Sequence, residues 1–222
     1  MKKRKSFSIN KIVFPNINLS NLTKLLEKIK YNEESGYGIF EIEEVDEILS
    51  ALLIKRNSTY IQQYNLTEQI FEKKSIYIYS RIKFYIDFEY NLLYTNGPST
   101  NLFQIISLLR NISGLRFDVS SLEVTPYKIY QLLKRKKIKF QLNELTIEKF
   151  NFKDGAIGKY TASISTMSIG IELIKLYKED ISKIVFDLNH YRVYFYNNNT
   201  LSIDGNIDDI EQNFQNLKNI II

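Results

Sequence analysis

The sequence contains no cysteine, so it offers no disulfide, no thiolate metal site and no cysteine nucleophile. Its single histidine, His190, excludes every site that needs two imidazole ligands. The glycine-rich patterns that cradle phosphates, G-x-x-x-x-G-K-[ST] and G-x-G-x-x-G, are also missing from a chain that holds only eight glycines. Enzymatic chemistry would therefore have to come from carboxylates, hydroxyls or lysines, without a cofactor.

Long apolar runs are absent as well. No stretch approaches the ~20 residues that a membrane-spanning helix needs, and the N-terminus passes from MKKRK directly into alternating residues. We therefore expect a cytoplasmic protein without membrane contact. Hydrophobic residues make up 44% and charged residues 25% of the 222 positions, which is typical of a folded globular chain.

The residue patterns predict an α+β fold that is rich in antiparallel sheet, with four to five helices packed on the sheets. A strand over Ser6–Phe14 is followed by a helix that Ser20 caps. From Gly36 to Thr95 the period changes to two, which predicts an antiparallel meander. Its strands are expected at Tyr37–Glu43, Leu49–Lys55, Thr59–Tyr64, Ser75–Asp87 and Leu92–Thr95.

Three helix starts are marked in the rest of the chain. Ser99 or Thr100 caps a helix after the Asn96-Gly97-Pro98 turn, Thr125-Pro126 starts another, and Asn206 caps the last one. These signals favour a β-meander plus helix module at 1–122 and a second α+β module at 123–222. One continuous domain is the alternative, because no linker rich in Pro, Gly or Ser separates the halves.

Charge is unevenly distributed along this chain, whose net charge is +5. Residues 1–30 carry eight basic side chains and one acid, whereas residues 31–50 carry seven acids and no Lys or Arg. A second basic block has no acid between positions 124 and 143. It consists of Lys128, Lys134, Arg135, Lys136, Lys137 and Lys139.

The second basic block leads to our first hypothesis, a non-enzymatic nucleic-acid-binding protein that contacts phosphates without reading sequence. The N-terminal cations Lys2, Lys3, Arg4 and Lys5 are expected to contribute. One face of the strand Ser75–Asp87 adds support, because it interleaves tyrosines with cations that can stack on bases and neutralise phosphates. These residues are Tyr77, Tyr79, Arg81, Lys83 and Tyr85.

The segment FYIDFEYNLLYTNGPSTNLFQIISLLRNI, with a meander before it and a basic helix after it, is similar in layout to a group of mobile-element proteins. These are prophage exclusion and recombination-associated proteins that bind DNA non-specifically as dimers. The resemblance implies a role in phage exclusion or defence and a homodimeric state.

Two other functions remain open from the sequence. The opposed charge blocks and the tyrosine-rich strand are also typical of a protein-interaction module, such as an inhibitor or an assembly subunit. Glu72 and Lys74, with Asp46 upstream, form the kind of fragment that a metal-dependent nuclease uses. His190 is expected in a hairpin turn, and we assign it no catalytic role.

Overall fold

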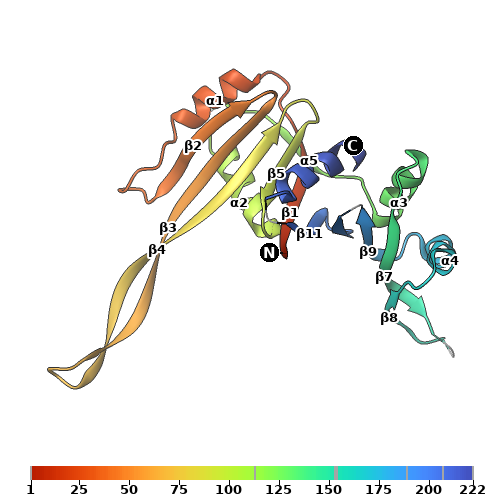
Figure 1. Ribbon diagram of the computed structural model, residues 1–222. Helices are drawn as coiled ribbons and strands as arrows, with labels where there is room; N and C mark the ends of the chain where they lie inside the picture. The colour runs from red at the N-terminus through yellow and green to blue at the C-terminus, as the bar shows by residue number, and fades with distance from the viewer. Residues whose placement is uncertain (1, 113, 153–154, 189, 207, 222) are drawn as a thin grey trace. The chain divides into compact units, whose positions relative to one another are not determined.

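The structure is a computed structural model that describes residues 2–112, 114–152, 155–188, 190–206 and 208–221. It confirms the expected fold class, an α+β protein dominated by antiparallel strands (Figure 1). The chain forms two compact units. Unit 1 comprises residues 1–11, 96–100 and 119–222, and unit 2 comprises residues 12–95 and 101–118. The division into modules at 1–122 and 123–222 stays a prediction.

Unit 2 contains the predicted meander, with strand order β2-β3-β4-β5 and antiparallel pairing throughout. Helix α1 packs on β2 and β3 through the buried side chains of Leu22 and Leu26. The elements are α1 (Leu19–Glu27), β2 (Tyr37–Val45), β3 (Ile48–Asn65), β4 (Ile70–Asp87), β5 (Leu92–Asn96) and α2 (Ser99–Arg110).

Unit 1 contains most of the first strand and the C-terminal half of the chain, with strand order β1-β11-β10-β9-β7-β8. Helix α4 packs on β7, α3 on β9, and α5 on β11. The elements are β1 (Lys2–Val13), β6 (Asp118–Ser121), α3 (Pro126–Arg135), β7 (Gln141–Asn151), β8 (Ile157–Ser163), α4 (Met167–Tyr177), β9 (Ile181–Leu188), β10 (Tyr191–Tyr196), β11 (Thr200–Asn206) and α5 (Ile210–Ile221).

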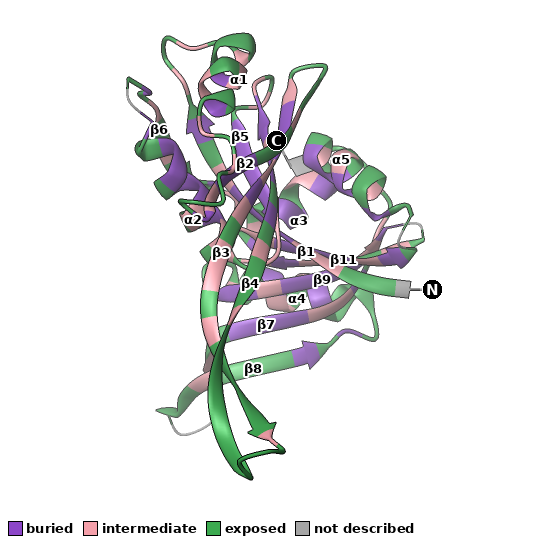
Figure 2. Ribbon diagram, turned by 90° about the vertical axis from the view of Figure 1, so that its left-hand side faces the viewer, coloured by how far each residue is buried: buried purple, intermediate pink, exposed green. Residues whose placement is uncertain are grey.

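Each unit buries its own apolar core, which Figure 2 marks in purple along the strands and the inward helix faces. In unit 1 the rings of Phe7 on β1 and Phe214 on α5 stack with their centroids 4.0 Å apart. In unit 2 the sheet face of Leu49, Leu53 and Phe84 is completely buried. Burial of this kind supplies most of the free energy of folding in a chain without disulfides.

Three local predictions were wrong, each for a local reason. Asn18, not Ser20, caps α1, because its side-chain oxygen accepts the Asn21 backbone N–H at 2.9 Å. The separate strands 49–55 and 59–64 form one strand, β3, because no turn interrupts its pairing with β4. Asn206 ends β11, and the last helix starts at Ile210.

Gly38 on β2 is required by a close backbone approach. A Cβ atom at this position would lie 2.5 Å from both Cα and N of Tyr31. The approach is fixed by hydrogen bonds from the Tyr31 N–H to the Ile39 carbonyl (3.0 Å) and from the Ile39 N–H to the Ile29 carbonyl (2.8 Å). Because backbone atoms cannot move aside as a flexible side chain can, a larger residue must displace this segment.

We expect Gly38→Ala to lower the free energy of unfolding by about 1–3 kcal/mol, measured by urea denaturation. Gly205→Ala is the matched control, because a Cβ there meets only ordinary contacts, with Tyr191 Cβ nearest at 3.5 Å. Equal stability of the two variants would contradict the close approach at Gly38.

Candidate nucleic-acid interface

Helix α3 places its basic side chains on the solvent face. The Thr125 hydroxyl oxygen accepts the Lys128 backbone N–H at 3.2 Å, and Pro126 occupies the first turn, as the sequence predicts. Ile129, Tyr130 and Leu133 are buried against the rest of unit 1. The basic residues of the helix are Lys128, Lys134 and Arg135, and all three are exposed.

These three cations line a hollow of about 720 Å³ together with Lys175 from the last turn of α4. No acidic residue lines it; the other lining residues are Tyr127, Tyr130, Gln131 and Leu132. We call the four cations Lys128, Lys134, Arg135 and Lys175 the α3–α4 basic patch. Lys175 could not be predicted as part of this group, because nothing in the sequence indicates that α4 lies beside α3.

The positive charge of the patch is not neutralised within the described part of the chain. None of its four cations makes an ion pair with an acid described there. The Lys128 ammonium donates to the backbone carbonyl of Glu123 at 2.8 Å, which orients the side chain and leaves its charge in place. The arrangement therefore attracts anions and offers several donors to one ligand.

The other three residues of the predicted block lie elsewhere on unit 1. Lys136 donates its ammonium to the Asn219 carbonyl at 2.8 Å. Lys139 lines a second hollow, of about 490 Å³, that also contains His190 and Asp209. Lys137 is exposed beyond the end of α3. The expected block of six is thus divided, and only Lys128, Lys134 and Arg135 share one hollow.

Lys137 holds the turn that ends α3, with a positive φ of 53°. Its N–H donates to the Lys134 carbonyl at 3.1 Å, and the Ile138 N–H donates to the Leu133 carbonyl at 3.0 Å. This pair of bonds is the Schellman motif, whose left-handed position favours glycine. The lysine here therefore imposes backbone strain.

The N-terminal cations are less available than the sequence suggests. They lie in β1, which begins at Lys2, and two of them are paired with acids. Arg4 makes a bidentate ion pair with Asp204 at 2.7 and 3.0 Å, and Lys5 contacts Glu211 at 2.6 Å. A phosphate ligand that contacted the whole run from Lys2 to Lys5 would have to compete with these two ion pairs.

Asp204 is the centre of a small polar cluster on unit 1. It accepts hydrogen bonds from Arg4 and from the Tyr194 hydroxyl at 2.8 Å, and the Arg4 guanidinium lies 4.0 Å from the Tyr194 ring centroid. The Arg4 hydrogen bond is the main cause that lowers the pKa of the Asp204 carboxyl, although partial burial acts in the opposite direction. The cluster stabilises the pairing of β1 with β11, where Arg4 faces Asp204.

The nuclease fragment does not assemble. Asp46 lies in the turn between β2 and β3, whereas Glu72 pairs with Gln63 near the far end of β3. At 3.3 Å per residue the two acids are about 50 Å apart along the strand. Within the described ranges no group of three or more His, Cys, Asp or Glu residues is arranged to hold a metal ion.

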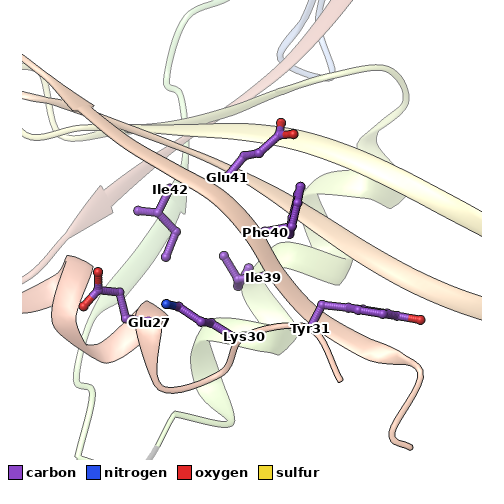
Figure 3. Close-up of a pocket in the computed structure, with 7 residues that line it drawn as sticks. All are labelled: Glu27, Lys30, Tyr31, Ile39, Phe40, Glu41 and Ile42. Carbon is purple, nitrogen blue, oxygen red and sulfur yellow. The ribbon is translucent and has the colours of Figure 1, made fainter. Parts of the chain in front are cut away.

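A further hollow, of about 380 Å³, lies between the end of α1 and β2 in unit 2 (Figure 3). Its charged lining residues are Glu27, Lys30 and Glu41, and Glu41 points away from Lys30 in this view. With two acids and one base, this hollow has no preference for anions comparable to that of the α3–α4 basic patch.

Comparison with known proteins adds no functional assignment. No protein-family model matches the chain, and no curated protein shows significant similarity to it. Among the residues that the structure describes, no helix is both long enough and apolar enough to cross a membrane. Functional inference therefore rests on the geometry and charge of the chain itself.

We expect Asp204→Asn to lower stability at neutral pH. Because the folded pKa of Asp204 lies below its unfolded value of about 3.9, its contribution is present above that value. The contribution is lost as the pH falls through the folded pKa. Urea denaturation between pH 7 and 2 should show a smaller acid-induced loss in the variant. Asp208→Asn is the control, and an identical pH dependence in both variants would contradict the role of Asp204.

We expect Lys137→Gly to raise the free energy of unfolding by up to about 1 kcal/mol, because glycine adopts the left-handed conformation without strain. Lys139→Gly, also exposed and two residues further on, removes the same charge without relieving a positive φ. Thermal unfolding of both variants measures the difference. A loss of stability in Lys137→Gly would show that the lysine side chain matters more than the turn.

Proposed function

We propose that this protein is a cytoplasmic, non-enzymatic nucleic-acid-binding protein whose α3–α4 basic patch contacts phosphates without reading base sequence. Lys128, Lys134, Arg135 and Lys175 provide the central contacts. Lys136, Lys137 and Lys139 lie outside the hollow of the patch, and in this proposal they make only peripheral phosphate contacts.

One observation supports this function above the others. Four cations from two helices surround one hollow that no acid lines, and none of them is ion-paired in the described part of the chain. A phosphate backbone is the common cellular ligand that presents closely spaced negative charges to such a surface. Binding releases the counterions condensed on the nucleic acid, which makes the affinity depend steeply on salt.

The position of the patch supports phosphate contacts that do not read base sequence. Lys134, Arg135 and Lys175 lie in the last turns of α3 and α4, where the helix dipole also favours cations. Long, flexible side chains in these positions reach phosphates by charge, whereas base reading needs groups held against base edges in a groove. We therefore expect similar affinities for unrelated sequences of equal length.

The test removes three charges of the patch in Lys134→Ser/Arg135→Ser/Lys175→Ser. We expect weaker binding to a short DNA duplex, and a plot of log affinity against log salt whose slope is smaller by about 0.9 for each phosphate that the variant no longer neutralises. Fluorescence anisotropy over a salt series measures both quantities. The decrease in affinity should be the same for duplexes of different sequence.

The matched control is Lys24→Ser/Lys28→Ser/Lys30→Ser near α1, which lowers the net charge by the same amount on exposed positions. It should retain the salt slope of the unmodified protein. If both variants lose affinity equally, binding follows net charge alone and the patch is not the site. If the unmodified protein does not bind duplex or single-stranded DNA at low salt, the proposed function is wrong.

A further inference from the structure

The longest strands of the protein form an extended hairpin in unit 2. Beyond Arg56, β3 has left its partner β2, and β4 meets β5 only from Phe84 onward. Between these points the two strands pair only with each other among the described residues. We call residues 56–81 the β3–β4 arm, and Figure 1 shows it as a twisted two-stranded ribbon that extends away from the unit 2 sheet.

The arm exposes an unusual amount of apolar surface. No residue from 56 to 81 is buried (Figure 2). Tyr60, Phe71 and Tyr77 are 69%, 70% and 60% exposed. An isolated two-stranded hairpin is only marginally stable in water, and exposed apolar clusters typically mark binding surfaces. The arm therefore has the properties of a binding element.

The register of the hairpin sorts its side chains by type. Residues directly opposite each other in an antiparallel pair share one face. The pairs Arg56↔Tyr79, Ser58↔Tyr77, Tyr60↔Ser75, Gln62↔Lys73 and Tyr64↔Phe71 therefore define a single face. It carries all five aromatic side chains of the arm, and we call it the aromatic face. The opposite face carries isoleucines and polar residues but no aromatic ring.

The charge of the aromatic face has one sign. Arg56 and Lys73 lie on it, Arg81 follows Tyr79 on the same side at the base of the arm, and no acid belongs to it. The one acid on the strands of the arm, Glu72, is on the opposite face, where it accepts a hydrogen bond from Asn65 at 2.8 Å. Arg56 is partly engaged, because it pairs with Glu33 at 3.1 Å and lies 4.6 Å from the Tyr77 ring centroid. Neither Lys73 nor Arg81 has an ion-pair partner among the described residues.

We propose that the aromatic face of the β3–β4 arm binds single-stranded nucleic acid. Bases stack on the exposed rings, of which Tyr60 and Tyr77 are central, while Lys73 and Arg81 contact the phosphates. Tyr77 and Tyr79 follow each other on this face of β4, so they lie about 7 Å apart along the strand, a spacing that admits an unpaired base between them. Bases within a duplex are already stacked on their neighbours, so the face selects unpaired strands.

Charge distinguishes this ligand from a second copy of the chain. A second copy that presented the same face would oppose cation to cation with no acid to neutralise them. Stacking and phosphate contact, by contrast, use both kinds of side chain that the face provides. The inference shares with the proposed function the assignment of nucleic acid as the ligand, but it concerns separate residues and can be tested separately.

The test compares Tyr60→Ser/Tyr77→Ser with Ile61→Ser/Ile78→Ser. The control changes the next residue on each strand, on the opposite face, where Ile61 and Ile78 are 42% and 51% exposed. The probes are an oligothymidylate of about 15 nucleotides and a duplex of equal length. We expect the tyrosine variant to bind the oligothymidylate at least about 5-fold more weakly for each tyrosine removed, with duplex affinity unchanged. The isoleucine variant should bind both probes normally.

A fluorophore on the face provides a second measurement. Because the chain has no tryptophan, Tyr60→Trp introduces a unique indole that retains stacking. We expect the oligothymidylate to quench its fluorescence strongly, and to quench Ile61→Trp on the opposite face much less. Tyr60→Phe/Tyr77→Phe should restore binding, because the ring and not the hydroxyl makes the contact.

Several outcomes would overturn the inference. Equal decreases in affinity for the tyrosine and isoleucine variants, or equal quenching of the two indoles, would show that the aromatic face is not the site. A dimer in light scattering that only the tyrosine variant dissociates, without single-strand binding, would assign the face to a second copy of the chain. If Tyr60→Ser/Tyr77→Ser keeps its affinity for the oligothymidylate while Lys134→Ser/Arg135→Ser/Lys175→Ser binds DNA more weakly, only the inference about the arm is wrong. The reverse result would support the aromatic face as a binding site and contradict the assignment of the α3–α4 basic patch.

Discussion

The uninterrupted antiparallel register between β3 and β4, from Ile48↔Asp87 to Asn65↔Ile70, is the constraint on which unit 2 depends. At its base the register directs Leu53 and Phe84 into the core, and further along it collects the aromatic side chains on one face. Because side chains alternate with a period of two, a slip of one residue would expose the core face and mix the two faces of the arm. Core packing at the base thus fixes the chemistry at the tip.

The two proposed surfaces use different physical interactions. The α3–α4 basic patch acts by charge, which extends over about 10 Å at 0.1 M salt and weakens as salt is added. The aromatic face, as proposed, adds contact between flat rings, which depends on the ligand having unpaired bases. A protein with both kinds of surface can bind nucleic acid broadly and still distinguish single strands from duplexes.

Local signals in the sequence were sufficient for much of the fold. Thr125-Pro126 predicted the start of α3 because a cap and a proline act within one helical turn. The alternation in Ser75–Asp87 predicted β4, and the structure adds that Tyr85 stacks on Tyr94 instead of joining the exposed row. The pattern predicted Ser20 as the cap of α1, whereas Asn18 caps it, because the choice depends on backbone angles that packing sets.

The sequence by itself determined the α+β class, the exposed cations of α3 and the absence of cysteine chemistry, since these follow from composition and from interactions within a few residues. Only the tertiary structure decided that Lys175 joins the α3 cations, that Lys139 does not, and that Asp46 lies far from Glu72. It also decided that β3 and β4 continue beyond their neighbours as an arm. These arrangements depend on helix packing and strand register between segments distant in the chain, which the pattern of any one segment does not encode.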